Sequence, residues 1–396
     1  MVGSERLLSI VIATRNRTVY AVKTVRALLK MPDSCFEVIV QDNSDKADFM
    51  NLAVDFLEDD RLCYRYTPPP FSSIDNFNAG IALAKGRYVC LIGDDDGVSK
   101  QLINAVRWAD VNGIDCLVGS INLEYRWPGV ASPEQDGGIF VIQHFSGEAK
   151  SADYKSALLR LIARGGVNYL DLPLPKLYHG VVKRACLDKV KRLTGNYLGG
   201  LSPDIYSAVA LSLVIEKLVT ADFPLTIPGI CTQSTSVTEG RNGAFSFSVS
   251  DAPHWRSREE YVWNKEVPSL YCATTIWADS CVSALKEMGR HDLVKRFGSR
   301  RLLEEIYWIY PQARPFLQKY EISEAGIWGR TAWKLKMNFR LLTGPMLIWI
   351  VKNIKKVVLR LSGRRAVISD ISDIYEAMER LETHLRQSRV SMRFMK

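Results

Sequence analysis

The chain has 396 residues, of which 47% are hydrophobic and 24% are charged, and its formal net charge is +9 at pH 7. This length accommodates two or three domains, and the composition is that of a globular protein rather than a disordered one. Its eight cysteines are scattered and form no C-x-x-C pair, so neither a zinc knuckle nor a disulfide framework is indicated. A reducing, cytosolic compartment is therefore expected.

The first apolar run, 7–13, leads directly into Thr14-Arg15-Asn16-Arg17 without a small-residue cleavage site, so we expect no signal peptide. No uninterrupted apolar run is long enough to span a bilayer. Periodicity and breaker residues then predict alternating elements. Strands are predicted at 7–13, 36–41, 62–66, 88–93 and 115–119, and helices at 18–29, 46–57, 74–84 and 99–112. Such alternation indicates βαβ units and a mainly parallel sheet covered on both faces.

Three of these strands end in polar clusters, at 14–17, 42–45 and 94–96. An acidic turn alone is usually just solvated, but ligands of parallel sheets bind beyond the carboxyl ends of the strands, where these clusters converge. The adjacent carboxylates of Asp94, Asp95 and Asp96 repel one another unless water or a cation screens them. A hard divalent metal such as Mg²⁺ or Mn²⁺, itself holding a phosphate, is their natural companion.

Beyond residue 119 the pattern is less regular. Strand-like segments are predicted at 122–147, 176–183 and 221–263, the last as an acceptor-side flap, and helices at 152–163, 184–193 and 203–218. Ser202 is the expected N-cap of the last helix, with Pro203 at its first position. Residues 267–320 are expected to be mainly helical.

Taken in order, these motifs resemble the family-2 nucleotide-sugar glycosyltransferases, which have a GT-A fold. The segments that carry the resemblance are 9–17, 38–44 (with Asp42-Asn43-Ser44), 75–80, 84–88 and 92–97, the last resembling the family's Asp-x-Asp motif. Segments 178–184 and 202–206 resemble those of bacterial members that build surface polysaccharides. The match covers roughly 7–236 and implies an α/β fold: a GT-A-like nucleotide-binding domain with a mainly parallel sheet, followed by a helical C-terminal region.

The resemblance also implies a nucleotide-sugar site. Asp94 is expected near the ribose and, with Asp96, as a ligand of Mn²⁺ or Mg²⁺, while Asp95 assists or buttresses the turn. The remaining pocket residues that it implies are Thr14, Arg15, Asn16, Asp42, Ser44 and Asn76. Asp42 would contact the nucleobase or ribose; the alternative role, an Asx-turn at the strand end, is compatible with this. Arg15 and Arg17 could equally be surface charges.

Asp204 is the candidate general base, which would deprotonate the acceptor hydroxyl during inverting transfer. Many family members carry Glu-Asp here, whereas this chain has Pro-Asp. The alternative is structural, because an acid in the first turn of a helix is stabilised by the helix dipole. His179 and His254 could be ligands, but a lone histidine is more often an ordinary, partly buried residue.

The excess positive charge is concentrated near the C-terminus, since residues 325–369 contain ten Lys and Arg and no acid. An amphipathic helix beginning at Gly344-Pro345, with Trp333 and Trp349 nearby, is typical of binding in the plane of an anionic membrane. The alternative is a helix docked on the catalytic domain with a solvated basic face. No recognition motif accompanies the charge, so nucleic acid is not favoured as a partner.

The last stretch has apolar residues spaced 4, 3, 4, 3 and 4 apart: Val367, Ile371, Ile374, Met378, Leu381 and Leu385. This heptad seam indicates a short coiled coil and a possible homo-oligomer, although packing on the same chain would produce the same pattern.

The predicted organisation is a GT-A domain at 1–236, a mixed or helical extension at 237–330, basic amphipathic membrane-associating helices at 331–366 and a coiled-coil-like helix at 367–396. The expected function is inverting, divalent-metal-dependent sugar transfer from a nucleotide sugar to a glycan acceptor, lipid-linked in an O-antigen or capsule pathway. The expected location is cytoplasmic, peripheral on the inner face of the cell membrane. The alternative is a non-catalytic membrane assembly subunit that retains the fold. A phosphatase with an Asp-x-Asp nucleophile is not favoured, because its aspartates would follow the first strand.

Overall fold

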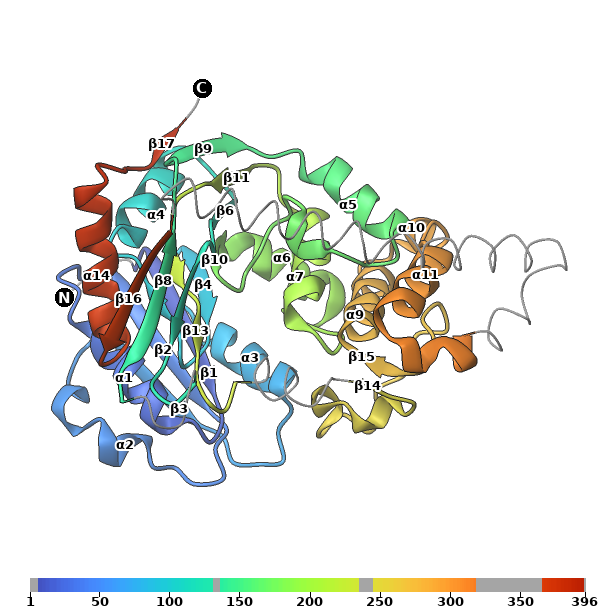
Figure 1. Ribbon diagram of the computed structural model, residues 1–396, viewed down its shortest axis with the longest axis horizontal. Helices are drawn as coiled ribbons and strands as arrows, with labels where there is room; N and C mark the ends of the chain where they lie inside the picture. The colour runs from blue at the N-terminus through green and yellow to red at the C-terminus, as the bar shows by residue number, and fades with distance from the viewer. Residues whose placement is uncertain (1–5, 131–135, 235–244, 318–364, 395–396) are drawn as a thin grey trace, which may run out of the picture.

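Figure 1 shows the computed structural model, which describes residues 6–130, 136–234, 245–317 and 365–394. The helices are α1 (Thr18–Leu29), α2 (Phe49–Leu52), α3 (Ser73–Ala82), α4 (Leu102–Val111), α5 (Tyr154–Ala163), α6 (Arg184–Thr194), α7 (Pro203–Ser212), α9 (Ala273–Glu287), α10 (His291–Val294), α11 (Ser299–Ile309) and α14 (Ile374–Gln387). The strands of the main sheet are β1 (Leu8–Thr14), β2 (Phe36–Asp42), β3 (Leu62–Tyr66), β4 (Tyr88–Ile92), β6 (Cys116–Gly119), β9 (Glu148–Ser151), β10 (Gly180–Lys183), β11 (Leu218–Ala221) and β17 (Arg393–Phe394). The shorter sheets contain β5 (Gly97–Val98), β7 (Leu123–Arg126), β8 (Gly138–Gln143), β12 (Thr226–Ile227), β13 (Gly229–Ile230), β14 (Phe245–Ser246), β15 (Tyr271–Cys272) and β16 (Arg365–Ile371).

The main sheet has nine strands in the order β17-β9-β11-β6-β10-β4-β1-β2-β3. β1 pairs in parallel with β2 and β4, and β2 pairs in parallel with β3, so the carboxyl ends of these four strands lie at one edge. β10 is antiparallel to both β4 and β6, and β9 is antiparallel to β11. The prediction of an α/β fold with a mainly parallel sheet is confirmed.

Two apolar cores cover the two faces of this sheet, as the continuous hydrophobic runs of β1, β2 and β4 require. Successive residues of a strand point to opposite faces. Val11 and Leu91 accordingly pack in one core with α3, α5, α6, α7, α9 and α11. Ile10 and Ile92 pack in the other core with α1, α4 and α14. This sandwich fixes the edge of the sheet at which the polar clusters lie.

The C-terminal segment departs from the predicted coiled coil. Residues 365–371 form β16, which is antiparallel to β8, and Val367 is 57% exposed. Asp373 then caps α14, its side chain accepting a hydrogen bond from the N–H of Glu376. The apolar face of α14 is buried against α1 and β5 of the same chain, and Figure 1 shows α14 beside α1. The coiled-coil prediction is therefore wrong, and the seam offers no basis for a homo-oligomer.

Two predicted helices are shorter than their patterns indicated. The predicted helix 46–57 is broken into α2 and a single 3₁₀ turn, because the Leu52 carbonyl accepts from Arg26 and Arg26 also pairs with Asp55. The predicted helix 203–218 ends at Ser212, and the N–H groups of residues 216 and 217 donate to Asp115 as the chain enters β11. Long-range side-chain contacts end both helices.

The predicted basic helices lie almost entirely outside the described residues, since only 365–366 of that segment are described, at the start of β16. Within the described ranges, no helix is both long enough and apolar enough to cross a membrane.

Candidate functional site

Asp94, Asp95 and Asp96 form a tight turn, the acidic turn, directly after β4 at the carboxyl edge of the sheet. Only 0%, 4% and 2% of their respective surfaces are exposed, so this is not a solvated loop. The Gly93 N–H donates to Oδ2 of Asp96 at 2.6 Å and closes the turn. A Cβ at Gly93 would lie 2.7 Å from the Tyr178 hydroxyl, which explains the need for glycine there.

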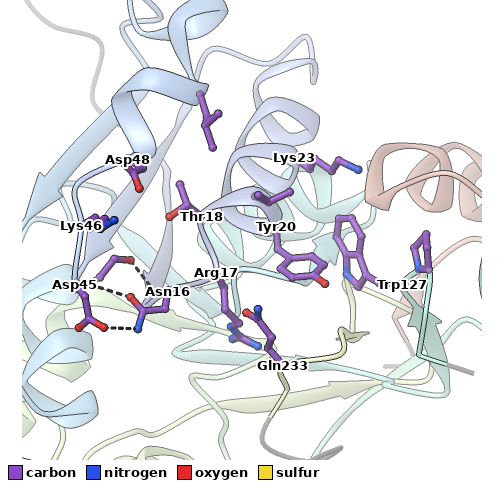
Figure 2. A pocket seen from close by; sticks show the side chains of 14 residues that line it. Asn16, Arg17, Thr18, Tyr20, Lys23, Asp45, Lys46, Asp48, Trp127 and Gln233 are labelled. Atoms are coloured by element: carbon purple, nitrogen blue, oxygen red, sulfur yellow. Dashed lines mark hydrogen bonds between the residues drawn. The ribbon is translucent and has the colours of Figure 1, made fainter. Parts of the chain in front are cut away.

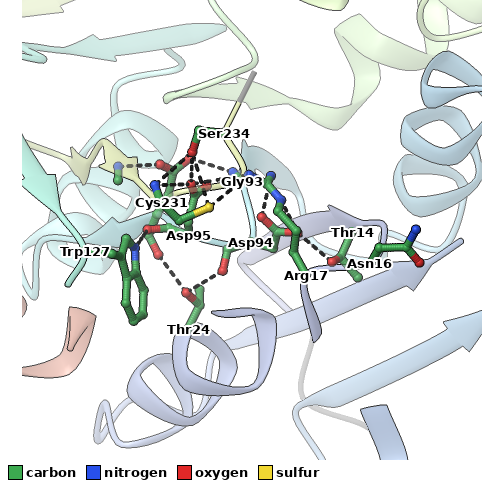
Figure 3. Close-up of polar contacts among 12 residues, drawn as sticks. Thr14, Asn16, Arg17, Thr24, Gly93, Asp94, Asp95, Trp127, Cys231 and Ser234 are labelled. Carbon is green, nitrogen blue, oxygen red and sulfur yellow. Dashed lines mark hydrogen bonds and ion pairs between the residues drawn. The ribbon is translucent and has the colours of Figure 1, made fainter. Parts of the chain in front are cut away.

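Arg17, the residue at the start of α1, is the ionic partner of the acidic turn (Figure 3). Its Nη2 lies 2.5 Å from Oδ1 of Asp94 and its Nε donates to Oδ2 of Asp94 at 3.1 Å, a two-pronged contact. Its Nη1 lies 3.4 Å from Oδ2 of Asp95. Thr14, at the end of β1, also donates to Oδ2 of Asp94 at 2.6 Å. Burial raises the pKa of Asp94, whereas Arg17 lowers it.

Residues 229–234, the crossing segment, pass over the acidic turn. Ser234 donates its hydroxyl proton to Oδ2 of Asp95 at 2.6 Å, and the Cys231 N–H donates to the same oxygen at 3.2 Å (Figure 3). The Gly229 N–H donates to Oδ1 of Asp96 at 2.6 Å. A Cβ at Gly229 would lie 1.7 Å from the Asp95 carbonyl oxygen, so only glycine permits this approach.

Asp96 has a second set of partners from the segment before β10. The Tyr178 hydroxyl donates to its Oδ2 at 3.0 Å, and Nε2 of His179 lies 3.4 Å from the same oxygen. His179 has a left-handed backbone with φ of 58°, which is strained for a non-glycine residue and held here by the surrounding contacts. Burial lowers the pKa of His179 to about 4, so the imidazole is neutral at pH 7.

The nucleotide-loop residues predicted from the sequence lie together at the ends of β1 and β2. Asp42 is buried, its Oδ1 accepting from the Ser44 N–H at 2.8 Å and its Oδ2 from the Tyr64 hydroxyl at 3.1 Å. The first of these bonds is an Asx-turn, the structural role considered above. The Ser44 hydroxyl accepts from the N–H of Asn16, whose φ is 55°.

A cavity of about 460 Å³, the strand-end cavity, opens beside these residues. It is lined by Ala13, Thr14, Arg15, Asn16, Arg17, Asn43, Phe71, Ser73, Asn76, Phe77, Leu201, Pro203, Gln233, Pro253, His254 and Arg256. Two buried polar atoms of this lining, Nε of Arg15 and Oδ1 of Asn76, have no hydrogen-bond partner among the described residues. Buried polar groups are normally paired, so a donor and an acceptor are left for a ligand.

A second cavity, of about 720 Å³, is also lined by Arg17, and its lining side chains are drawn in Figure 2. Asn16, Arg17 and Gln233 line both cavities. Tyr20 and Trp127 form an edge-to-face pair in its wall, with Lys23 over the Trp127 ring. Arg17 therefore stands where two hollows and the acidic turn meet.

Asp204 lies in the first turn of α7, next to Pro203 of the strand-end cavity. The Tyr169 hydroxyl donates to Oδ2 of Asp204 at 3.4 Å. Burial raises the pKa of Asp204, and the nearby negative charge of Asp96 raises this pKa further. His179, Tyr169 and Lys176 lower the pKa of Asp204, but the net shift is upward. Ser202 occupies the N-cap position, but its hydroxyl makes no capping bond. The structure thus brings Asp204 within electrostatic reach of the acidic turn.

A family model described as "Glycosyl transferase family 2" matches residues 9–135, which include β1, β2, α3 and the acidic turn. This part of the chain is therefore similar to that family. A curated relative, the GalNAc(5)-diNAcBac-PP-undecaprenol beta-1,3-glucosyltransferase of Campylobacter jejuni, is 28% identical over 169 residues. The alignment covers 38% of this chain and 52% of the relative, so the chain spans about half the length of that protein.

Several solved structures are similar to this chain at low sequence identity. TarS 1-349 of S. aureus, solved with UDP-GlcNAc, is 16% identical, with 59% of this chain and 60% of that chain covered and a TM-score of 0.41. The mannosyltransferase PcManGT of Pyrobaculum calidifontis, solved with GDP-Man and Mn²⁺, is 11% identical, with 86% and 87% covered and a TM-score of 0.37.

The family-2 resemblance implies a divalent metal at the acidic turn, and the carboxylate oxygens are of the right chemical type. Their arrangement does not fit one. Asp94 and Asp95 are paired with Arg17, and both oxygens of Asp96 accept hydrogen bonds from protein donors. In the described part of the chain, no group of three His, Cys, Asp or Glu residues is placed to hold a metal ion. The roles predicted for Asp94 and Asp96 as metal ligands stay predictions.

Sequence reasoning missed three features of this site: Arg17 as the partner of the acidic turn, the crossing segment, and the contact of Tyr178 and His179 with Asp96. Arg17 belongs to the polar cluster after β1, which the sequence analysis identified. The sequence did not indicate which of the two arginines in this cluster would contact the acidic turn. Nothing in the local sequence around 229–234 indicates its contact with Asp95.

Proposed function

We propose that this chain is an active glycosyltransferase that moves a sugar from a nucleoside diphosphate to a hydroxyl acceptor. The observation that supports this most directly is the strand-end cavity. Within the described part of the chain, Nε of Arg15 is a donor and Oδ1 of Asn76 an acceptor without a partner, and this cavity lies next to the helix that carries Asp204. A nucleotide sugar presents both phosphate acceptors and hydroxyl or base donors, which complement these two groups.

The proposed reaction is a single displacement with inversion. The acceptor hydroxyl oxygen attacks the anomeric carbon while the bond from that carbon to the diphosphate oxygen breaks, and the nucleoside diphosphate leaves. Asp204 takes the hydroxyl proton, which a carboxylate with a raised pKa does better than an ordinary one. The diphosphate gains negative charge in this step, so a cation must face it.

We propose a lipid-linked glycan as the acceptor, in the assembly of a surface polysaccharide such as O-antigen or capsule. The support is the name of the C. jejuni relative, whose acceptor is an undecaprenol-linked glycan. The second candidate is a non-catalytic assembly subunit that binds a nucleotide sugar without turnover. Asp204 close to the acidic turn favours the enzyme, because binding alone needs no base.

Donor binding is tested by adding a panel of nucleoside diphosphates and nucleotide sugars to the full-length protein and measuring its melting temperature. One nucleotide class should raise it, because a ligand that binds only the folded state stabilises that state. Arg15→Ala should weaken the affinity about tenfold, the usual effect of losing a charge-assisted hydrogen bond. Arg65→Ala, an exposed arginine on β3, is the control and should change nothing. If no nucleotide shifts the melting temperature of the unsubstituted protein, the proposed function is wrong.

We also propose that the chain is peripheral on the cytoplasmic face of the membrane, held by the basic segment at 325–369. Replacing Lys352, Lys355, Lys356 and Arg360 with Gln should abolish co-sedimentation with anionic vesicles, because each such charge contributes about 1 kcal/mol near an anionic surface. The control replaces four exposed charges on α6 and near α10, namely Lys189, Lys191, Arg192 and Lys295, and should leave sedimentation unchanged. Equal sedimentation of both variants would contradict attachment through this segment.

A further inference from the structure

The guanidinium of Arg17 contacts the carboxylates that would otherwise contact a bound metal cation. Its guanidinium is tied to Asp94 through two nitrogens and to Asp95 through a third, while 23% of the side chain stays exposed. Arginine is the cation of choice for planar, two-pronged recognition of carboxylates and phosphates, and it keeps its charge at any working pH. The acidic turn contacts all three guanidinium nitrogens, and the same side chain also lines the two cavities.

The carboxylates behind Arg17 have little capacity left for another cation. Oδ2 of Asp95 accepts from Ser234 and the Cys231 N–H, and Oδ2 of Asp94 accepts from Thr14. Asp96 accepts from two backbone N–H groups and from the Tyr178 hydroxyl. A divalent ion needs several oxygens directed at one point. Here both oxygens of Asp94, both oxygens of Asp96 and Oδ2 of Asp95 are directed at fixed protein donors.

The lining of the strand-end cavity has the charge that a diphosphate requires. Arg15, Arg17 and Arg256 line it, and none of its described lining residues is acidic. The three aspartates are absent from that lining, so a ligand in the cavity meets the Arg17 guanidinium rather than the carboxylates that hold it. Buried or partly buried arginines in such a setting attract anions and stabilise charge that develops on a leaving group.

We propose that Arg17, held by Asp94 and Asp95, is the cation that binds the donor diphosphate, with Arg15 and Arg256, so that donor binding does not require a divalent metal. This inference rests on the proposed function, since it concerns the same donor site. It gives the acidic turn a different task from the predicted one. Asp94 and Asp95 orient an arginine, and Asp96 holds the crossing segment and the turn together.

The experiment is calorimetric titration of the EDTA-dialysed full-length protein with UDP, GDP, dTDP and ADP, repeated with excess MnCl₂. Affinity for the preferred diphosphate should agree between the two conditions within a factor of about three. Arg17→Ala should lower the metal-free affinity about tenfold or more, and Arg17→Lys should restore only part of it, because lysine cannot make the two-pronged contact. Arg65→Ala is again the control.

Arg17→Ala could also disturb the fold by leaving Asp94 unpaired, so Arg256→Ala provides a second measurement. Arg256 is exposed, so the fold should tolerate its replacement. The Arg256→Ala substitution should still weaken binding of the diphosphate more than binding of the matching nucleoside. Tight binding only in the presence of Mn²⁺ would overturn this inference and leave the proposed function intact. No binding in either condition would instead contradict the proposed function. Equal affinities for diphosphate in the Arg17, Arg256 and parent proteins would also overturn the inference.

Discussion

Deleting residues 365–396 will make the protein insoluble or strongly destabilised, because this segment completes the core beneath the acidic turn. It removes β16 from the sheet that contains β7 and β8, and it removes α14 from α1 and β5. Ile374 is fully buried, and two of its carbon atoms would lie 2.8 and 2.9 Å from a Cβ at Gly97, the residue after Asp96. The deletion would expose a row of apolar side chains, each worth about 1.5–3 kcal/mol of burial.

Point substitutions measure the same effect without removing a strand. Met378 and Leu381 are each 1% exposed, and either residue changed to Ala should lower the free energy of unfolding by about 2–5 kcal/mol in a urea titration. Thr383→Ala, on the exposed face of α14, is the matched control and should change it little.

A coiled coil between chains would give a different result. In that case Leu381→Ala would lower the mass measured by light scattering and spare the stability of the monomer. The packing seen here requires unchanged mass and lower stability. The same packing bears on membrane attachment, because a truncation placed ahead of the basic segment would also remove β16 and α14 and with them part of the core. Substitution of the basic side chains is therefore the sharper test of attachment.

The sequence sufficed for features that depend on local periodicity. The predicted helix 18–29 and strand 62–66 match α1 and β3 residue for residue, since their apolar spacing and flanking breakers lie within the element itself. The polar clusters after β1, β2 and β4 converge because parallel strands end at one edge. These rules predicted the mainly parallel sheet and the part of the chain in which its site lies.

Partners distant in sequence could not be predicted. Arg17 meets Asp94 across 77 residues, and Ser234 meets Asp95 across 139. No spacing rule connects such pairs, so either arginine of the nucleotide loop was an equal candidate. The heptad seam on α14 could not reveal its partner either. Its apolar spacing indicates a buried helix face, but it does not indicate which surface covers that face.

Asp204→Asn should reduce sugar transfer by about 10²–10⁴-fold, the usual contribution of a general base, while nucleoside diphosphate affinity stays the same. Asp171→Asn is the control, because Asp171 is an exposed acid in the short helical turn that also carries Tyr169. Initial rates on a lipid-linked acceptor, with donor affinity measured in parallel, separate the two effects. Unchanged transfer by Asp204→Asn would eliminate this residue as the base.

The pH profile gives a second, independent measure of the same role. Transfer needs Asp204 in its ionised form, and burial raises the pKa of Asp204. The rate should therefore increase with pH, and the midpoint of this increase should lie above the pKa of an ordinary carboxyl group. Tyr169 donates to the ionised carboxylate and lowers this pKa. Tyr169→Phe should therefore move the acid limb of the profile to higher pH, and a shift to lower pH would contradict the assignment.

Stability distinguishes the base from a residue that only favours the helix start. Because the folded-state pKa of Asp204 is raised, its ionisation costs folding free energy as pH rises through the unfolded-state value, and the full cost is present above the folded-state pKa. At neutral pH Asp204→Asn should thus be as stable as the parent or more stable, although it is less active. If Asp204 served only to stabilise the start of the helix through its dipole, Asp204→Asn would lower the stability of the protein by about 0.3–1 kcal/mol and leave its activity unchanged. A buried carboxylate that costs stability, yet lies in the helix turn next to the strand-end cavity, is the pattern expected of a functional group.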